Sequence, residues 1–570
     1  MSYFLKKTKN KKGVYLQIYE SYYNPERKAG AHRSFKPIGY VHELIERGIE
    51  DPVAHFQTEV DALNRQHKAK KQADKIRTIS DESPEKYLGY FPVKNINDSL
   101  HTKRFIDLMQ TATDFRFNVY DMLSALVYSR VVHPCSKAKT YVEVLPKLFE
   151  NAEFSLDQVY TGLAYLGMEY EKIIEIYNHQ IHLGYNFDTS HTYFDCTNFY
   201  FEIDREDEFR RKGPSKENRH DPIVGLGLLL DANQVPLGMR IYPGNRSEKP
   251  VMREVIDGLK ERNNISGRTI QVADKGLNCG NNIVHALKAG DGYLFSRSVK
   301  KLSKEEKVWV LLPNDYREVR NSNGDVLYRY KSCIDVFEYE IDDENGRKRT
   351  VKLTEKRVVT YNPVLAKKQR LEINKLIEKA KNLKTSQAKK SEYGECAQFV
   401  NFVSTDKKGT PTGGKIKITM NEAAIENARK LAGYNMLVTS ELTMPDQELY
   451  RTYHNLWRIE ESFRIMKSEL DARPVYLQKE ETITGHFLIC YIAVLLMRLL
   501  QFKALNNEFS TEEIFTFIRD FRVAKISDRK YMNLARNRRF IKSLSAKTGL
   551  PLTSYFLSYG QIKNMLSHRF

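Results

Sequence analysis

The chain has 570 residues, of which 41% are hydrophobic and 11% aromatic, so it can fill several hydrophobic cores and is not a disordered protein. Its 91 lysine and arginine residues outnumber its 72 aspartate and glutamate residues and give a net charge of +19. This excess is spread along the chain and favours a polyanionic partner, first of all nucleic acid, although soluble proteins without such a partner can also be this basic.

Three features predict a cytoplasmic protein that is neither secreted nor embedded in a membrane. The first residues, MSYFLKKTKNKKGVYL, are basic but lack the apolar core of a secretory signal. The most apolar run, residues 487–497, is too short to cross a bilayer and precedes Arg498, so it predicts a buried helix. The six cysteines are scattered without a CxxC pair, which is typical of reduced thiols in the cytoplasm.

The first 188 residues divide into two predicted parts. Residues 1–90 begin with strand-like segments and continue with a polar helix, which predicts a β-then-α module. Residues 91–188 have helical periodicity throughout and predict an all-α domain. Together they predict a mainly helical N-terminal region with the module 1–90 at its start.

The pattern changes to β at Thr189, and residues 189–300 form a third predicted part. The runs HTYFDCTNFYFEI, IVGLGLLLD and VPLGMRIY predict three antiparallel strands. A helix, the buried strand RTIQVAD, a second helix and the strand GYLFSRS follow. Antiparallel strands followed by alternating helix and strand predict a mixed α/β sheet.

Residues 301–432 break this order and predict a β-rich insertion with its own small sheet and a charged helix. The α/β pattern resumes at residues 433–500 with the strand NMLVTS, which a helix follows. Residues 501–570 are basic and predict a helical C-terminal region.

Three acidic residues stand out by their positions in these predicted elements. Asp195 lies inside the first strand, in YFDCTNF, among neighbours that would normally exclude a charge. Asp274 lies where the strand RTIQVAD meets its turn, and Glu460 lies on the helix that follows the resumed sheet. A carboxylate at such a place costs several kcal/mol unless cations or hydrogen bonds compensate it.

Each acid alone has a structural explanation: Asp274 can cap a turn, Asp195 can lie on an edge strand, and Glu460 can pair with Arg464. Together, on a strand, a strand end and a helix, they match the three carboxylates that a pair of Mg²⁺ or Mn²⁺ ions requires. Two such ions activate an attacking hydroxyl and stabilise the leaving oxygen of an in-line phosphoryl displacement. We therefore interpret the three acids as catalytic metal ligands.

Residues 451–470, RTYHNLWRIEESFRIMKSEL, predict one helix that packs an apolar stripe on a core. Tyr453, Glu460 and Lys467 are spaced by sevens, which places a hydroxyl, a carboxylate and an ammonium along one seam of that helix. The seam is either a row of surface ion pairs or one wall of an active site.

These residues resemble the bacterial insertion-sequence DDE transposases that carry a Tyr-Arg-Glu-Lys helix motif, Y-x2-R-x3-E-x6-K. The first Asp of the family falls on Asp195 in FDCTNFYFE and the second on Asp274 in VADKGLNCGNNI. The motif falls on Tyr453, Glu460 and Lys467, and the segment YPGNRSEKP is also similar to the family. The resemblance covers residues 190–500 well and the N-terminal region more loosely.

The resemblance implies an RNase H-like catalytic domain, with residues 189–300 as its first part and 433–500 as its second, which the β-rich insertion 301–432 interrupts before the catalytic Glu. It implies that the mainly helical N-terminal region, with the module 1–90, binds DNA. It implies that Tyr453 and Lys467 contact phosphates on either side of the scissile bond. It also implies a homodimer that cuts in trans in a synaptic complex. Within this resemblance, the seam of the 451–470 helix is interpreted as a wall of the active site.

One position departs from the family motif, because Leu456 stands where the motif has its Arg. In the family this Arg and the Lys contact phosphate, so the departure bears on the route of end processing, including any DNA hairpin intermediate. Arg458 and Arg464 are the candidate substitutes. Arg464 is favoured, since it lies one turn from Glu460 on the same side.

The sequence therefore predicts a transposase that binds the terminal inverted repeats of its insertion sequence, cleaves double-stranded DNA there and joins the 3′-hydroxyl ends to target DNA. The expected cofactors are two Mg²⁺ or Mn²⁺ ions. Two alternatives stay open: an RNase H-like nuclease without strand transfer, and a catalytically silent DNA-binding protein derived from a transposase.

Overall fold

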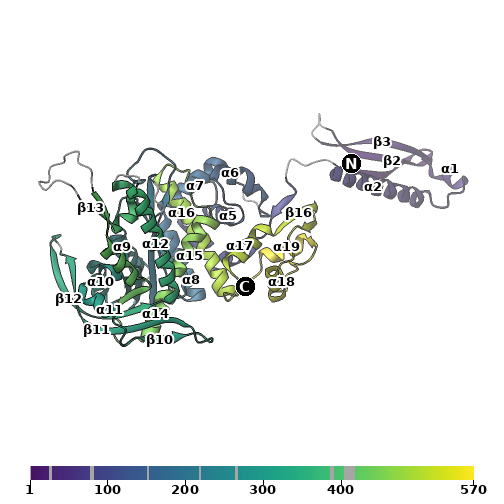
Figure 1. The fold of residues 1–570 in the computed structure, drawn as a ribbon. Helices are drawn as coiled ribbons and strands as arrows, with labels where there is room; N and C mark the ends of the chain where they lie inside the picture. Colours follow the sequence, from purple (N-terminus) through teal and green to yellow (C-terminus); the bar gives the residue numbers. More distant parts are fainter. Residues whose placement is uncertain are drawn as a thin grey trace. The chain divides into compact units, whose positions relative to one another are not determined.

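The computed structural model describes residues 2–24, 29–77, 83–150, 153–216, 220–262, 267–343, 345–385, 390–403 and 417–570 (Figure 1). The chain forms two compact units, Met1–Pro84 and Glu85–Phe570.

The first unit is a three-stranded antiparallel sheet in the order β1-β2-β3, covered by a long helix. Its elements are β1 (Ser2–Asn10), β2 (Gly13–Asn24), β3 (Ala29–Tyr40), α1 (Val41–Glu46) and α2 (Pro52–Arg77). Leu16 and Ile18 of β2 are fully buried with Val60 of α2. Asn64 fixes α2 to the edge strand, because its side chain accepts from the Tyr3 N–H at 2.8 Å and donates to the Tyr3 carbonyl at 2.9 Å.

The second unit begins with a short strand and a set of helices. These are β4 (Glu85–Tyr87), α3 (Phe91–Ser99), α4 (Lys103–Gln110), α5 (Val119–Val132), α6 (Lys137–Lys139), α7 (Leu156–Met168) and α8 (Tyr170–Tyr185). Asn118 caps α5 by accepting from the Asp121 N–H, and a capping box of Ser155 and Gln158 starts α7.

A nine-stranded sheet follows, in the order β10-β11-β12-β15-β9-β8-β5-β6-β7. Its strands are β5 (His191–Tyr200), β6 (Ile223–Leu230), β7 (Pro236–Pro243), β8 (Ile270–Ala273), β9 (Gly292–Arg297), β10 (Arg317–Arg320), β11 (Val326–Asp342), β12 (Lys348–Tyr361) and β15 (Tyr434–Thr439). The pairs β5–β8 and β8–β9 are parallel and the other pairs are antiparallel. The predicted mixed α/β sheet is confirmed.

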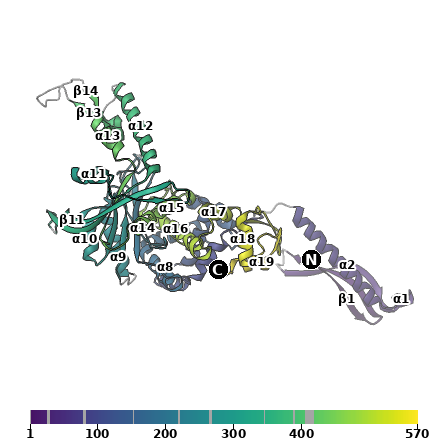
Figure 2. The ribbon, with the colours of Figure 1, turned by 60° about the horizontal axis from the view of Figure 1, so that its bottom comes forward.

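Residues 301–432 were expected to form a sheet of their own, and here the prediction is wrong for their longest strands. The β11–β12 hairpin extends the central sheet, because residues 356–361 of β12 pair with residues 434–439 of β15. The run 355–360 of β12 is buried and therefore takes a place inside a larger sheet. A separate two-stranded sheet is formed by β13 (Val400–Val403) and β14 (Lys417–Met420), which lies with α13 (Glu422–Lys430) along α12 (Pro363–Thr385) (Figure 2).

Helices cover both faces of the central sheet. Alternate residues of a strand point to opposite faces, so the two faces can be told apart by the core cluster that each residue joins. On one face α9 (Glu248–Arg262) and α10 (Gly280–Lys288) pack on Phe194, Ala273 and Phe295. Tyr193 and Val272 point to the other face, where they join the largest core cluster.

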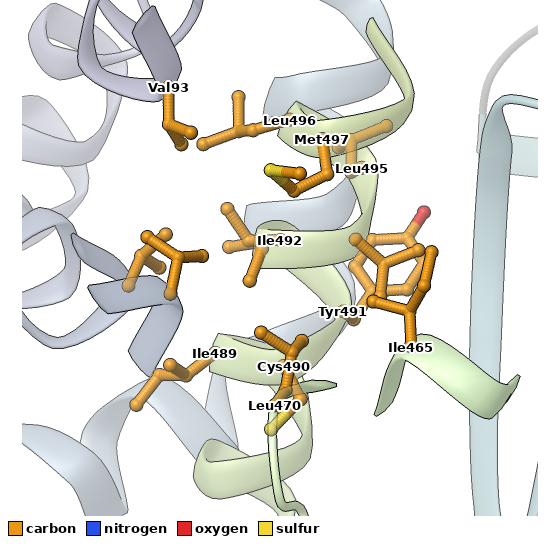
Figure 3. Close-up of a cluster of buried hydrophobic side chains, with 14 of the residues drawn as sticks. Val93, Ile465, Leu470, Ile489, Cys490, Tyr491, Ile492, Leu495, Leu496 and Met497 are labelled. Atoms are coloured by element: carbon orange, nitrogen blue, oxygen red, sulfur yellow. The ribbon is translucent and has the colours of Figure 1, made fainter. Parts of the chain in front are cut away.

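The centre of that cluster is α16 (Glu480–Leu499), which η6 (Leu500–Ala504) continues. Figure 3 shows side chains of this helix, among them Ile489, Ile492 and Leu496, packed against neighbouring elements. Residues 480–504 are long and apolar enough to cross a membrane, but the most apolar 18-residue stretch of this segment is entirely buried inside the protein. The predicted buried helix is confirmed.

Two glycines allow α16 to approach α7 closely. A Cβ on Gly485 would collide with the Leu163 carbonyl, and one on Gly167 would collide with the Glu481 carbonyl. We expect Gly485→Ala to lower the free energy of unfolding by about 1–3 kcal/mol, because the two backbones must separate. Urea denaturation measures this change. The control is Gly184→Ala in α8, where a Cβ meets nothing within 4 Å and no loss is expected; an equal loss in both variants would contradict the close-packing explanation.

The C-terminal region contains strands as well as helices, so the prediction of a helical region at 501–570 is incomplete. Its elements are α17 (Thr511–Asp520), β16 (Arg522–Ser527), β17 (Lys530–Asn533), α18 (Arg539–Thr548), β18 (Phe556–Ser558) and α19 (Tyr559–Leu566). The strands form a four-stranded sheet in the order β18-β17-β16-β4. Val523 of β16 and Tyr531 of β17 bury their side chains in the core, and this burial stabilises the two segments as strands.

Candidate active site

Asp195 and Asp274 occupy equivalent positions on neighbouring parallel strands. Phe194 of β5 is in register with Ala273 of β8, and each Asp is the next residue. Ala273 is also in register with Phe295 of β9, and the residue after Phe295 is Ser296. Asp195, Asp274 and Ser296 therefore lie side by side where the parallel pairing ends, the place where open α/β sheets bind ligands.

Both acids point to the face of the sheet that α16 covers. Asp195 is two residues from Tyr193 and Asp274 is two residues from Val272, and both apolar residues belong to the core cluster of that face. The helix α15 (Trp457–Arg464) packs on β5 on the same face. The two acids are thus directed toward the segment in which the sequence places Glu460.

The Asp195 carboxylate is held in a buried and acidic environment, with only 21% of its side chain exposed. Burial raises its pKa to about 6, against the opposing effects of Lys216 at 3.8 Å and of the Cys196 N–H, which donates at 2.7 Å. The negative charges of Glu248 and Asp274 raise this pKa further. The negative charges of Asp195 and Asp274 therefore repel each other, and a nearby cation would stabilise both carboxylates in their charged form.

Asp274 accepts two hydroxyl hydrogen bonds on the same oxygen. Ser296 Oγ donates to Asp274 Oδ1 at 2.9 Å, and the Tyr453 hydroxyl donates to it at 3.0 Å. Burial, followed by the charge of Asp274, raises the pKa of Tyr453 far above its ordinary value. Tyr453 therefore stays protonated and acts as a donor that orients Asp274.

We expect Tyr453→Phe to lower the free energy of unfolding by about 1–3 kcal/mol, because a partly buried carboxylate loses one of its two hydroxyl donors. Urea denaturation at neutral pH measures the change. Tyr476→Phe is the matched control, since its side chain is 69% exposed. Equal stability of Tyr453→Phe and the native protein would show that Ser296 alone satisfies Asp274.

Two lysines lie beside Asp195. Lys216 also approaches Glu248 at 3.5 Å and donates to the Cys196 carbonyl. Burial lowers the pKa of Lys467 to about 8, and the positive charge of Lys216 lowers it further while Asp195 opposes the shift. The Lys467 ammonium lies 5.4 Å from the centre of the Phe199 ring. The carboxylates thus meet a basic side chain from the 451–470 segment and another from the loop after β5.

The prediction that residues 451–470 form one continuous helix is wrong. It consists of α14 (Asp446–His454), α15 and the π-helix η5 (Ile465–Glu469). The backbone tightens first, with Leu456 N–H donating to the Tyr453 carbonyl at 3.0 Å, and later widens, with Leu470 N–H donating to the Ile465 carbonyl at 2.8 Å. Because the turns differ in width, steps of seven residues do not keep side chains on one straight line.

Glu460 makes no described contact with either aspartate in this structure. It is exposed, and among the described residues no hydrogen bond or ion pair joins it to another side chain. Within the same ranges, no three His, Cys, Asp or Glu side chains are close enough together to hold a metal ion. The structure brings together Asp195, Asp274, Tyr453 and Lys467, and the role of Glu460 as third ligand stays a prediction.

The two arginines predicted to contact phosphate are turned toward Glu461, not Glu460. Arg458 Nη1 donates to Glu461 Oε2 at 3.1 Å, and Arg464 approaches Glu461 Oε1 at 3.8 Å with 70% of its side chain exposed. Leu456, at the position of the motif Arg, is a core residue that is 8% exposed. Arg464 is the more accessible of the two, and phosphate binding by both stays a prediction.

Sequence reasoning missed Lys216, Glu248 and Ser296. Glu248 starts α9 directly after the segment YPGNRS, so the similarity of that segment to the family offered a signal for it. Ser296 offered the signal of a polar residue near the end of a buried strand. Lys216 lies in a loop without periodicity, where the sequence carries no such signal.

Comparison with known proteins agrees with this geometry. The sequence matches the family model of the transposase DDE domain over residues 187–496, more than half of the chain. The matched range begins just before β5, includes β8 and α15, and ends within α16. No curated protein matches the sequence. On the family match, the chain belongs to the transposases with a DDE domain.

Proposed function

We propose that this transposase binds the terminal inverted repeats of its insertion sequence, cleaves the DNA there and transfers the 3′-hydroxyl ends to target DNA by divalent-metal-dependent phosphoryl transfer. The observation that carries the proposal is the pair Asp195 and Asp274, next to each other at the ends of parallel strands and coupled through their charges. An acidic pair on a basic protein suits a site that holds cations against the phosphates of a nucleic acid.

The strand arrangement supports an RNase H-like catalytic domain. The antiparallel strands β5, β6 and β7 are followed by the parallel strands β8 and β9, with β5 in the middle of the five. Residues 301–432 separate this part from β15 and the Glu460 segment, which supports an inserted segment before the third acid.

The residues fit a divalent cation, because Asp195 and Asp274 offer hard oxygen ligands in one acidic field. Asp195, Asp274 and Glu460 would hold Mg²⁺ or Mn²⁺, two ions in our proposal. Such ions, when bound, activate the attacking hydroxyl and stabilise the leaving oxygen.

The other residues of the site act on the carboxylates and on the DNA. Tyr453 and Ser296 fix the orientation of Asp274 through their hydroxyls. Lys467 contacts a phosphate on one side of the scissile bond in our proposal. Tyr453 contacts the phosphate on the other side once DNA is bound, when its hydroxyl turns from Asp274 to the phosphate, and Arg458 and Arg464 add positive charge beside them. Lys216 balances the charges of Asp195 and Glu248 until the cation and DNA are in place.

We place end recognition in the N-terminal region, in a homodimer that assembles two DNA ends in the cytoplasm. The first unit offers exposed basic side chains along β1 and the turn that follows it: Lys6, Lys7, Lys9, Lys11 and Lys12. Exposed lysines on a strand edge suit contacts with DNA phosphates, which fix position without reading bases.

The test incubates the purified protein and Mg²⁺ with duplexes from both flanks of its coding sequence and a supercoiled target plasmid. Plasmid that carries covalently joined flank DNA supports the proposal. Nicked or cut flank DNA without joining indicates a nuclease without strand transfer. Binding of the flanks without any cut, in Mg²⁺ and in Mn²⁺, would contradict the proposal and indicate a silent DNA-binding protein.

A further inference from the structure

A second basic cluster lies where α5, residues 135–137 and α16 meet the loop 471–477. It consists of Arg130, Lys137 and His486, whose exposed fractions are 4%, 5% and 5%. Basic side chains are rarely buried to this degree unless they are paired. None of the three takes part in the proposed catalytic site, so their burial needs a separate explanation.

The hydrogen bonds of this cluster define its charge. His486 Nε2 lies 3.2 Å from the Ala472 carbonyl, which can only accept, so Nε2 carries the proton. Nδ1 is then the acceptor for the Lys137 ammonium at 3.3 Å. Burial lowers the pKa of His486 well below its ordinary value, and the charges of Lys137 and Arg130 lower it further. The ring is neutral. Burial, followed by the charge of Arg130, also lowers the pKa of Lys137 well below its ordinary value. The permanent positive charge of the cluster is therefore that of the Arg130 guanidinium, and an anion beside Lys137 would favour its charged form as well.

No acid balances this charge among the residues that the structure describes. Arg130 Nη1 donates to the Leu470 carbonyl at 3.3 Å, and no described ion pair joins Arg130 or Lys137 to a carboxylate. No carboxylate is among the groups whose charges shift the pKa of Lys137. Asp471, an exposed residue, is the acid that lines the same cavity. A buried lysine can release its proton, but a buried guanidinium stays charged, and without a counter-charge it is strongly unfavourable. An anionic partner is therefore the direct explanation for the burial of Arg130, and it would keep Lys137 charged beside it.

The cluster borders a cavity of about 100 Å³ that can receive such a partner. Its polar lining includes Arg130, Ser136, Lys137, Tyr160, Asp471 and His486. A water molecule needs about 10–15 Å³ on such a scale, whereas pockets for drug-sized ligands begin at about 300 Å³. The cavity therefore has room for a small anion and some water, and is too small for a nucleoside.

We propose that this cavity is a binding site for a phosphate-type oxyanion, held by the ammonium of Lys137 and the guanidinium of Arg130. An oxyanion offers several acceptor oxygens, which suits the three donors of an ammonium and the planar donor set of a guanidinium. Two sources supply this chemistry: free inorganic phosphate and a phosphodiester of the DNA backbone. The site itself does not depend on the catalytic function proposed above.

The first experiment uses the full chain and inorganic phosphate, in calorimetric titration and in thermal unfolding at constant ionic strength. We expect one phosphate per chain and a rise of the unfolding midpoint with phosphate. Lys137→Met should weaken phosphate binding at least tenfold and remove the rise. The matched control is Lys139→Met, whose side chain is 51% exposed and which should bind phosphate as the native protein does.

Two results would overturn the proposal. One is a native protein that shows no saturable binding of phosphate, a measurement that needs no variant. The other is Lys137→Met that folds and keeps the native affinity for phosphate, which would make Lys137 a structural residue only.

A second arm, with a short DNA duplex of arbitrary sequence, identifies the source of the oxyanion. If the DNA backbone supplies it, duplex DNA displaces phosphate, and Lys137→Met lowers DNA affinity and reduces the salt dependence by about one phosphate contact. If free phosphate is the ligand, it stays bound at saturating DNA, and Lys137→Met binds DNA with native affinity.

Discussion

Asp195→Asn and Asp274→Asn are each expected to lower the rate of DNA cleavage at least about 10³-fold, a loss of about 4 kcal/mol of transition-state stabilisation. The amide keeps the shape of the side chain but removes the charge that the cation requires. Burial and the neighbouring acids already disfavour the charged form of Asp195, so the fold does not need this charge. Binding of the DNA ends should therefore remain near native while cleavage is lost, as electrophoretic shift and cleavage assays would show.

Asp257→Asn is the matched control for these two variants. Asp257 lies on α9 with 56% of its side chain exposed and pairs with His285 at 2.9 Å. It should cleave DNA as the native protein does. Loss of end binding in Asp195→Asn and Asp274→Asn, with native binding in the control, would mean that the two acids support the DNA-binding fold and are not catalytic.

Glu460→Gln tests whether the third acid joins this pair, and it should lose cleavage to the same extent. Glu460 is exposed and without a described partner, so its substitution should not affect folding. If Glu460→Gln cleaves normally and Glu248→Gln does not, the third ligand is Glu248, whose charge already acts on Asp195.

The positions of Asp195 and Asp274 could be predicted because they depend on local patterns. A charged residue inside or directly after an apolar strand is visible in the sequence, and parallel strands bring their ends together. The burial of residues 487–497 was predictable for the same reason. The hydroxyl bond from Tyr453 to Asp274 joins residues 179 positions apart and has no local pattern.

The errors have a common physical origin in long-range pairing and in backbone geometry. Whether a hairpin forms its own sheet or extends another depends on its partner, and β12 finds that partner in β15 more than seventy residues later. The change of helix type between Tyr453 and Leu470 preserves the apolar stripe, so periodicity alone could not show it. Lys216 reaches Asp195 from a loop, where the sequence pattern does not determine the path of the chain.

Glu461→Gln is expected to have the largest effect on stability, a loss of about 3–5 kcal/mol in the free energy of unfolding. Arg498 is fully buried, and its Nη2 lies 3.1 Å from Glu461 Oε2, while the Thr511 hydroxyl donates to Glu461 Oε1 at 3.1 Å. Removing the negative charge leaves the Arg498 guanidinium buried without its counter-charge. Urea denaturation at neutral pH measures the loss.

The neighbouring residue supplies the control, because Glu460→Gln changes an exposed carboxylate and should alter the free energy of unfolding by less than about 0.5 kcal/mol. The double variant Glu461→Leu with Arg498→Met should be more stable than Glu461→Gln, since it removes both charges together. A loss below about 1 kcal/mol in Glu461→Gln would show that Gln501 and the backbone carbonyl of Arg458 suffice for Arg498.

The same contacts determine how the contribution of Glu461 to the free energy of unfolding depends on pH. Burial acts to raise the pKa of Glu461, but the charges of Arg498 and Arg458 outweigh it, and the net pKa is lowered. The stability that Glu461 contributes is therefore fully present above the pKa of an unfolded glutamate, about 4.3, and is lost as the pH falls through the lowered folded value. The difference in stability between the native protein and Glu461→Gln should narrow only below about pH 4. Measurements can therefore distinguish the two adjacent glutamates. Glu460→Gln should lose DNA cleavage, and Glu461→Gln should lose free energy of unfolding.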